Sequence, residues 1–266
     1  IMNKYIALLI SFFLLGTLHS KNYEFERGMG NLIGKETWSR CSEKLASKEA
    51  KEYELSYERS ITMPKSPFAG EYEPKFLPPV GLAGSKQIYN MDVLNENVND
   101  GNQGTQMDAF GHFSHTQEKW DGESDLKAED AKYFGGFTQK EVKPSPDSPL
   151  LKLGMETVPP IITSAILLDV RKHMFEGKSM EAGQYVTVEH LKKTIELSGL
   201  SERGLKPGDV VLINTGWSDH YEDPDISKVY YSYAPGISYE TAKFLGTKKV
   251  VAVGLDTPFV DAVPNP

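Results

Sequence analysis

The sequence is poor in the residues that would give it disulfides, glycans or a nucleic-acid surface. Cys41 is the only cysteine in 266 residues, so no intramolecular disulfide can form, and the thiol is either buried or paired between chains. No Asn-x-Ser/Thr sequon occurs, so N-glycosylation is not expected. The formal charge of −8, together with the lack of a basic run, argues against a nucleic-acid partner.

Long apolar runs are also scarce, apart from one at the N-terminus. Asn3-Lys4 precedes a nearly continuous apolar stretch from Tyr5 to Leu18, and small or polar residues follow it. The stretch is too short for a comfortable transmembrane helix and is typical of a cleavable signal peptide, although a signal anchor is the alternative. We therefore expect residues 1–20 to be a signal peptide, the mature protein to be secreted, and no stable membrane insertion to remain after cleavage.

The first half of the remaining chain contains a predicted helix followed by a proline-rich passage. Apolar residues at three- and four-residue spacings predict a helix from Thr37 to Tyr57. Five prolines and several glycines make residues 61–85 an extended, loop-rich passage, which we interpret as a segment wrapping the same domain. We expect residues 21–266 to form a single domain, because a chain of this size buries enough surface without a disulfide or metal.

The second half alternates regularly between strands and helices. Continuous apolar runs predict buried strands within 160–170, 208–215 and 249–255. Thr187 and Ser238 can each cap a helix, the first stopped by Gly199 and the second by Gly246. This order predicts an α/β domain with a largely parallel or mixed sheet.

The segment from Asn102 to His112 carries most of the chemistry. It reads Asn-Gln-Gly-Thr-Gln-Met-Asp-Ala-Phe-Gly-His, and His115 follows, in a chain with six histidines. Oxygen and nitrogen donors grouped this tightly can hold a divalent cation and leave a base beside it. The segment therefore predicts hydrolysis of an amide or a lactone.

Five landmarks, in order, resemble those of the metal-dependent cyclase or kynurenine-formamidase-like family. Gly104-Thr105-x-x-Asp108-Ala109-x-x-His112 is similar to the family signature His-x-Gly-Thr-His-x-Asp-Ala-Pro-x-His. The other four are Ile166-Leu-Leu-Asp-Val, Lys206-Pro-Gly-Asp-Val-Val-Leu-Ile-Asn-Thr-Gly-Trp-Ser218, Pro235-Gly-Ile-Ser238 and Gly254-Leu-Asp-Thr-Pro258. The resemblance extends from roughly residue 70 to the end of the chain.

The resemblance implies a swivelling β/β/α fold, in the α/β class with a mixed sheet. It also implies a metal-dependent hydrolase that uses zinc or manganese to cleave an amide or lactone bond in a small, usually aromatic substrate. Arylformamidase activity on N-formylkynurenine, a step of tryptophan catabolism, is the activity we expect first. Family members are often dimeric, so a homodimer is a further expectation.

Carried over position by position, the signature gives roles to four residues. Asp108 matches a metal ligand and His112 matches the catalytic base, whereas Asn102 and Gln106 stand where the family has its two ligand histidines. Amide oxygens are neutral, harder donors than imidazole, so the resemblance favours manganese or magnesium over zinc, with lower affinity. Phe110 also replaces the signature proline.

The family supplies a further histidine and glutamate after the Asp-Thr-Pro strand. This sequence has no histidine after His220 and ends at Pro266. Two explanations remain open: the chain is C-terminally incomplete, which we favour, or it has kept the fold and lost catalysis.

Each candidate also has a plain structural interpretation. Asp108 could satisfy backbone N–H groups of a turn, His112 could be a hydrogen-bonded histidine, and Gln106 is as suited to a backbone contact as to a metal. Trp217 follows a strand, where it could stack on an aromatic substrate or close the core. Asp256 is expected to organise the turn before Pro258.

Other residues are expected to be structural. His115 is expected to be structural or exposed, and His173, His190 and His220 are expected to be surface residues. Tyr230, Tyr231 and Tyr233 could line the pocket entrance, although a packed surface is the safer interpretation. The leading hypothesis is a secreted metal-dependent hydrolase of a small molecule. The rivals are a non-catalytic binding protein on the same scaffold and, with less support, a structural protein that associates through Cys41.

Overall fold

The computed structural model describes most of the chain as two compact units. It describes residues 25–48, 51, 53–67, 72–81, 83–96, 104–124, 127–221 and 227–264. One unit combines Ile1–Asn31 with Ala109–Val158, and the other combines Leu32–Asp108 with Pro159–Pro266. The expected signal peptide lies outside the described residues, and the single domain over 21–266 stays a prediction.

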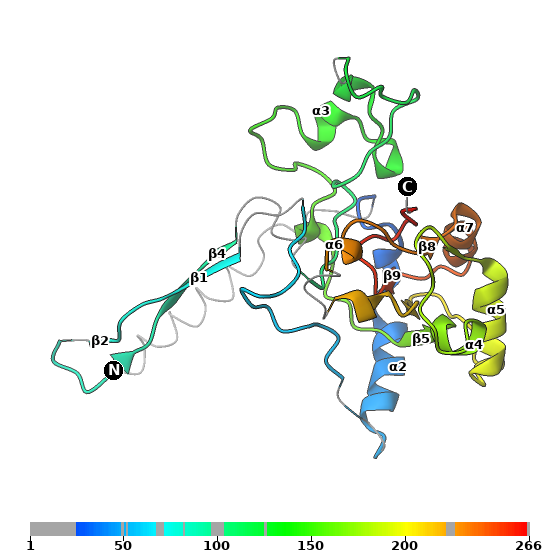
Figure 1. Ribbon diagram of the computed structural model, residues 1–266, viewed down its shortest axis with the longest axis horizontal. Helices are drawn as coiled ribbons and strands as arrows, with labels where there is room; N and C mark the ends of the chain where they lie inside the picture. Colours follow the sequence, from blue (N-terminus) through cyan, green and yellow to red (C-terminus); the bar gives the residue numbers. More distant parts are fainter. Residues whose placement is uncertain are drawn as a thin grey trace, which may run out of the picture. The chain divides into compact units, whose positions relative to one another are not determined.

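A three-stranded parallel sheet is the centre of the larger unit (Figure 1). Its strands are β5 (Ala165–Asp169), β7 (Val210–Asn214) and β9 (Ala252–Leu255), and their order is β5-β7-β9. The structure confirms the three strands that the apolar runs predict, but the prediction that they are buried is wrong for part of each strand, and no residue of β9 is fully buried. Burial alternates along β5 and β7, so one face of the sheet is buried while the other is covered only in part: Leu168 is buried, whereas Leu167 is 58% exposed.

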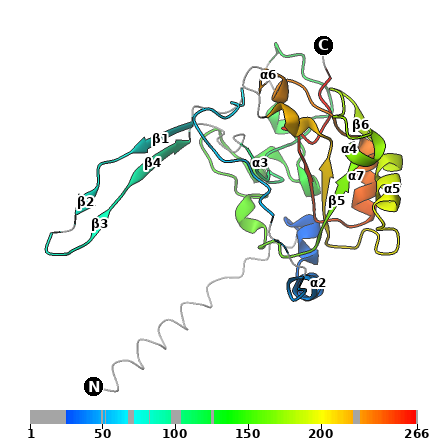
Figure 2. The same cartoon turned by 60° about the horizontal axis from the view of Figure 1, so that its bottom comes forward.

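Three helices contribute buried residues to the core beside the sheet. After β5 come α4 (Val170–Met174) and α5 (Val188–Leu197), and α7 (Tyr239–Thr247) precedes β9 (Figure 2). The core between these helices and the sheet is made by buried aliphatic residues and a methionine: Ile166, Leu168, Val170, Met180, Val186, Leu191, Val211, Ile213, Ile237, Leu245 and Val250. The unit is therefore a mixed α/β structure.

The predicted caps begin α5 and α7. Thr187 Oγ1 accepts the His190 backbone N–H at 3.2 Å, and His190 Nδ1 accepts the Thr187 N–H at 3.3 Å. Ser238 Oγ accepts the N–H of Thr241 at 3.2 Å. The structure confirms both starts, although α7 continues through Gly246 to Thr247.

The N-terminal helix is much shorter than predicted. α2 (Lys35–Leu45) ends at Leu45, with Ala46 as its C-cap, so the prediction of a helix reaching Tyr57 is wrong. Tyr57 instead stacks on Tyr221, a contact between distant segments that periodicity cannot reveal. Leu45 is exposed, so the apolar stripe of the helix does not gain enough burial to extend it.

An antiparallel ribbon replaces the wrapping loop expected over 61–85. β1 (Tyr72–Phe76) pairs with β4 (Asp92–Glu96), and β2 (Val80–Gly81) pairs with β3 (Ile88–Tyr89). Prolines are tolerated here because β1 has only one paired edge, so a missing N–H can face away from the ladder. The loop interpretation was therefore wrong for the residues in β1 and β2.

Short elements complete the described chain. In the larger unit β6 (Tyr185–Val186) runs parallel to β8 (Gly236–Ile237), and η7 (Trp217–His220) and α6 (Ser227–Tyr230) follow β7. η2 (Gly28–Leu32) precedes α2, and the smaller unit has η4 (Ala128–Asp130), η5 (Phe134–Gly136), α3 (Gln139–Val142) and η6 (Met155–Thr157).

A buried carboxylate organises the smaller unit. Glu26 accepts the Leu153 backbone N–H at 2.7 Å and the Lys152 ammonium at 3.2 Å. Phe110 stacks on Phe134 with ring centroids 4.3 Å apart. The contacts of Glu26 join segments that are more than a hundred residues apart along the chain, so neither segment forms this unit alone.

Another buried carboxylate lies at the amino end of the parallel sheet. Asp209 accepts hydrogen bonds from the Arg203 guanidinium (2.5 and 2.8 Å), the Ser164 hydroxyl (2.6 Å) and the Lys206 backbone N–H (2.7 Å). Burial raises the pKa of Asp209, but these hydrogen bonds outweigh it and leave the pKa below its ordinary value. Arg40 of α2 lies 3.7 Å from the same carboxylate, which attaches α2 to the sheet.

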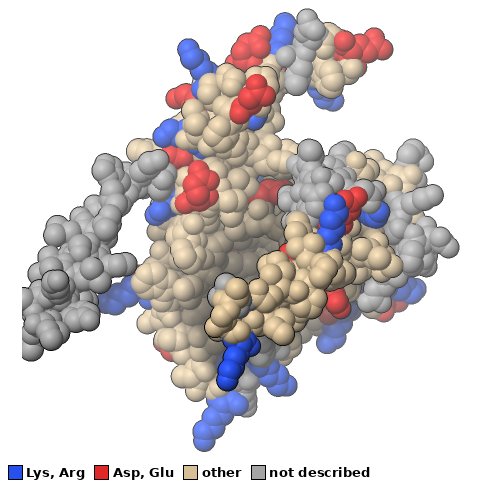
Figure 3. Space-filling view, turned by 90° about the vertical axis from the view of Figure 1, so that its left-hand side faces the viewer, with Lys and Arg blue, Asp and Glu red and all other residues tan. Residues whose placement is uncertain are grey.

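Charges of both signs are interspersed on the face shown in Figure 3, and most of that face is uncharged. Among the described residues, no helix has the length and apolar character needed to cross a membrane.

Candidate active site

The predicted site segment enters the described structure at a glycine with a positive φ. Gly104 has φ +109°, in the region that favours glycine, and Thr105 Oγ1 donates to the Leu55 carbonyl at 3.1 Å. A residue with a Cβ would be disfavoured at position 104, which explains the glycine of the signature. Asn102, a predicted metal ligand, lies outside the described residues.

Gln106 and Asp108 are brought together in the larger unit. The Gln106 side-chain amide donates to Asp108 Oδ1 at 2.9 Å, and both side chains are exposed. An ordered carboxylate with an amide beside it is a small polar site open to solvent. The metal-binding roles of both residues stay predictions.

Tyrosines surround the Gly104 turn within the same unit. A backbone hydrogen bond joins Gly104 to the phenol of Tyr231, and a Cβ at Gly104 would lie 4.0 Å from the Tyr221 hydroxyl. Tyr57 stacks on Tyr221 with ring centroids 4.4 Å apart and planes inclined by 14°. Tyr230 meets Tyr221 edge-on at 5.2 Å. We call Tyr57, Tyr221, Tyr230 and Tyr231 the tyrosine cluster.

Three members of the tyrosine cluster have raised pKa values. Burial raises the pKa of Tyr231 to about 12, and it also raises the pKa of Tyr221 and Tyr230. Tyr221 and Tyr231 are buried, whereas Tyr57 is 45% exposed. The motif therefore lies beside an aromatic surface that could receive an apolar ring through Tyr57.

Side chains at the carboxyl ends of the parallel strands form one hydrogen-bonded set. The Asn214 amide donates to Asp169 Oδ1 at 3.0 Å, which links the ends of β7 and β5. Asp256, just after β9, accepts the Thr215 N–H (2.8 Å), the Thr215 hydroxyl (2.6 Å) and the Gly216 N–H (2.8 Å). This edge is where open α/β sheets place ligands.

Asp256 therefore holds a different turn from the expected one. The sequence suggested that it organises the turn before Pro258, whereas its carboxylate binds the turn that follows β7. The Asp-Thr-Pro and Asn-Thr-Gly-Trp landmarks are partners across two strands. Their common position at strand ends was the signal that could have indicated this pairing.

Trp217 is packed rather than displayed. Its side chain is 3% exposed, and the indole N–H donates to the Tyr230 carbonyl at 3.3 Å. The ring also meets His220 edge-on at 4.4 Å. Through its hydrogen bond to Tyr230, Trp217 packs against the tyrosine cluster. A substrate contact by Trp217 stays a prediction.

His112 belongs to the smaller unit, because the division falls between Asp108 and Ala109. Its backbone N–H donates to the Ala109 carbonyl at 2.9 Å, and its exposed ring meets Phe113 edge-on at 4.4 Å. The preceding Gly111 N–H donates to the Leu153 carbonyl at 3.0 Å, and a Cβ there would lie 2.9 Å from the Leu150 side chain. This close packing fixes the turn that carries His112.

The remaining described histidines have structural contacts. His115 pairs through its backbone with Lys132, His190 caps α5, and His173 Nε2 lies 3.3 Å from the Ser198 hydroxyl. His190 is part of a capping box rather than a fully solvated residue of its helix.

The described donors do not complete a metal shell by themselves. Among the described residues, no three histidine, cysteine, aspartate or glutamate side chains lie close enough together to hold an ion. Asp108 and Gln106 supply one carboxylate and one amide, which are compatible with a hard divalent ion such as manganese and poorly suited to zinc. Further ligands would have to come from water, from outside the described residues, or from a substrate.

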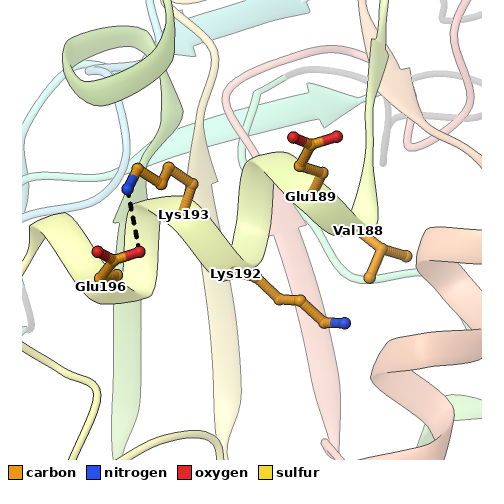
Figure 4. A pocket seen from close by; sticks show the side chains of 5 residues that line it. All are labelled: Val188, Glu189, Lys192, Lys193 and Glu196. Carbon is orange, nitrogen blue, oxygen red and sulfur yellow. Dashed lines mark hydrogen bonds and ion pairs between the residues drawn. The ribbon is translucent and has the colours of Figure 1, made fainter.

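A surface hollow on α5 differs from the Gly104–Asp108 segment in its residues. Five side chains of this one helix line it: Val188, Glu189, Lys192, Lys193 and Glu196 (Figure 4). The Lys193 ammonium pairs with Glu196 at 3.1 Å, so two of its charges neutralise each other. It has neither the landmarks nor the aromatic surroundings of the Gly104–Asp108 segment.

Comparison with known proteins gives a family match and structural neighbours. The family model described as "Putative cyclase" matches residues 53–262. A crystal structure of a novel cyclase superposes with a TM-score of 0.73 at 19% identity, over 90% of this chain and 74% of that one. No curated protein matches.

Two weaker neighbours are isatin hydrolases. Isatin hydrolase A from Ralstonia solanacearum has a TM-score of 0.47 at 18% identity, over 79% of this chain and 67% of that one. An isatin hydrolase bound to the product analogue thioisatinate has a TM-score of 0.40 at 18% identity, over 76% and 65%. The likeness to the novel cyclase shows the fold.

Proposed function

Because the chain belongs to the family of putative cyclases, matched over residues 53–262, we propose that it is a metal-dependent hydrolase. The bond cleaved is an amide or a lactone in a small aromatic molecule, with arylformamidase activity on N-formylkynurenine, in tryptophan catabolism, as the first candidate. The proposal includes a swivelling β/β/α fold and secretion of the mature protein. The observation that carries it is the Gly104–His112 segment, with its aspartate and histidine at the signature positions.

The chain's own groups have defined tasks in this proposal. His112 takes a proton from water, and the water oxygen forms a bond to the carbonyl carbon of the substrate. The carbon–nitrogen bond of an amide, or the ring carbon–oxygen bond of a lactone, then breaks. His112 returns the proton to the leaving nitrogen or oxygen, so the base is regenerated.

Asp108, Gln106 and Asn102 would hold the ion, with manganese favoured over zinc. A divalent ion held there would lower the pKa of a bound water and would polarise the carbonyl. The hydrogen bond from Gln106 to Asp108 keeps the carboxylate oriented. A hard ion of this kind would be bound weakly and would be lost on chelation.

The tyrosine cluster supports the choice of an aromatic substrate. Tyr57 presents a half-exposed ring whose other face rests on the buried Tyr221, and Tyr231 is joined to the backbone of Gly104. A ring stacked on Tyr57 would be near the motif without burying a charge. Such stacking adds roughly 0.5–1.5 kcal/mol beyond the area buried.

The test compares His112→Ala with His115→Ala in the full-length protein. We expect manganese to restore hydrolysis of N-formylkynurenine, or of a lactone, after chelation. His112→Ala should then lower kcat/KM by roughly 10²–10⁴-fold, because general base catalysis is lost. His115 lies outside the signature and is equally exposed, so His115→Ala should leave turnover nearly unchanged.

The rival is a non-catalytic binding protein on the same scaffold. It is favoured by the replacement of two signature histidines by Asn102 and Gln106, and by the incomplete donor set of the described residues. The rival is correct if no divalent metal binds and neither formyl amides nor lactones turn over. Turnover that survives His112→Ala would instead exclude His112 as the base.

A further inference from the structure

The carboxylate of Asp256, which follows β9, takes all its printed hydrogen bonds from the turn that follows β7. Oδ1 accepts the backbone N–H of Thr215 at 2.8 Å and its hydroxyl at 2.6 Å. Oδ2 accepts the N–H of Gly216 at 2.8 Å and, more weakly, that of Ser218 at 3.4 Å. A charged acceptor forms stronger hydrogen bonds than a neutral one, so this side chain fixes the path of the turn.

The same turn is packed closely by the segment after β5. Gly216 has φ +84°, and a Cβ there would lie 2.8 Å from the Arg171 side chain and 2.9 Å from the Cα of Ser179. The Thr215 carbonyl accepts the Met180 N–H at 2.9 Å. The backbone of the turn therefore has little freedom, and a change in its hydrogen bonds displaces the residue that follows it.

Trp217 follows the turn and connects it to the tyrosine cluster. Its backbone N–H donates to the Thr215 hydroxyl at 3.3 Å, and that hydroxyl donates to Asp256. Its indole N–H donates to the Tyr230 carbonyl at 3.3 Å. A continuous series of hydrogen bonds and one indole ring therefore leads from the Asp256 carboxylate to Tyr230.

Ring contacts continue from Tyr230 to the exposed part of the tyrosine cluster. Tyr230 meets Tyr221 edge-on at 5.2 Å, and Tyr221 stacks on the half-exposed Tyr57 at 4.4 Å. Tyr230 also meets Tyr231 edge-on at 4.9 Å, and Tyr231 is joined to the backbone of Gly104. The exposed ring of Tyr57 and the Gly104 turn therefore share one support.

We propose that Asp256 is a positioning residue for the binding of an aromatic ring: it fixes the turn after β7 and thereby holds Trp217 and the aromatic surface that Tyr57 presents. The identity of the ring rests on the proposed function, in which the substrate is a small aromatic amide or lactone. In this role Asp256 acts through the turn and has no contact with the ligand.

The experiment compares Asp256→Asn with Asp209→Asn, the same substitution at opposite ends of one sheet. In Asp256→Asn one acceptor oxygen becomes an amide donor that faces backbone N–H groups, so the turn has to move. Asp209→Asn breaks the buried pair with Arg203 and controls for a general loss of stability. The probe is formanilide, a neutral aromatic formamide, added to protein treated with a chelator so that no turnover occurs.

NMR titration of formanilide gives the dissociation constant for each variant. Asp256→Asn should raise Kd by roughly 2- to 10-fold, the value of one lost ring-stacking contact. Asp209→Asn should keep the wild-type Kd. Thr215→Val, which removes only the hydroxyl between Asp256 and Trp217, should also raise Kd, and it tests the role if Asp256→Asn fails to fold. A wild type that does not bind formanilide, or a Kd that none of these substitutions changes, would overturn the proposal.

The fluorescence of Trp217 reports the turn without any ligand. Trp38 and Trp120 are 51% and 54% exposed, so phenylalanine can replace both and leave Trp217 as the only tryptophan. In this background Asp256→Asn should shift the emission to longer wavelength and increase quenching by acrylamide, because the buried indole gains contact with water. Asp209→Asn should change neither. Equal emission and quenching in the two variants contradicts control of Trp217 by Asp256.

Kinetics with manganese separate this proposal from the proposed function. If wild type hydrolyses formanilide, Asp256→Asn should raise KM by a larger factor than it lowers kcat, because ring binding is lost. A lower kcat with unchanged KM would assign Asp256 to the chemical step and overturn the positioning role. If wild type binds formanilide without hydrolysing it, the proposed function fails, while Kd and Trp217 emission still decide the role of Asp256.

Discussion

At the scale of single residues, two aspartates hold opposite ends of the parallel sheet. Asp209 precedes β7 and takes its hydrogen bonds from Arg203, Ser164 and the Lys206 backbone. Asp256 follows β9 and takes its bonds from the turn after β7. Asp209 binds an arginine at the amino ends of the strands. Asp256 organises the carboxyl ends, which is the edge where a ligand is expected. We therefore expect Asp209 to contribute to stability and Asp256 to contribute to the geometry of the site.

Asp209→Asn should destabilise the fold with a characteristic pH dependence. At neutral pH we expect a loss of roughly 2–4 kcal/mol, because a buried carboxylate loses its charge while Arg203 keeps its own. The folded-state pKa of Asp209 is depressed, so its contribution is complete above the ordinary carboxyl pKa of about 4 and is lost as pH falls through the folded value.

Urea unfolding of wild type and Asp209→Asn at several pH values measures this. The difference in the free energy of unfolding should be constant near neutral pH and should shrink below about pH 4. A difference that grows as the pH falls would show that the sign is wrong. A mere loss of packing would give a difference independent of pH.

Residue-scale patterns identified the candidate site only in part. Asp108, Gln106 and His112 could be named because the signature is local in sequence. Tyr57 and Tyr221 could not, because they are 164 positions apart by number and meet only through the fold. Asp256 could be recognised as a turn residue, but the turn that it holds lies on a neighbouring strand.

At the scale of elements, the sequence was sufficient where the residues that begin an element are close together along the chain. Thr187 and Ser238 start helices through hydrogen bonds to residues three positions later, so the cap can be read directly. The strands β5, β7 and β9 follow from continuous apolar runs. The length of α2 was overestimated because periodicity does not show whether the apolar face of a helix is buried. The ribbon was missed because its prolines resemble those of a loop.

Thr187→Ala tests how much the predicted cap contributes. The substitution removes the hydroxyl that accepts the His190 N–H, so we expect the free energy of unfolding to fall by about 1 kcal/mol. Thr187→Ser should retain most of the stability. Lys193→Ala, which breaks an exposed ion pair on the same helix, should change stability by less than about 0.5 kcal/mol. Chemical denaturation of the three variants gives the comparison, and an equal loss for Thr187→Ala and Thr187→Ser would contradict the capping role.

At the scale of the whole molecule, the family could be recognised because its landmarks occur in order along most of the chain. The family model covers 53–262, and the novel cyclase superposes over 90% of the chain. The division into two units could not be predicted, since one unit joins the segment around Glu26 to residues 109–158. Hydrophobic periodicity describes segments, whereas a unit is defined by contacts between distant segments.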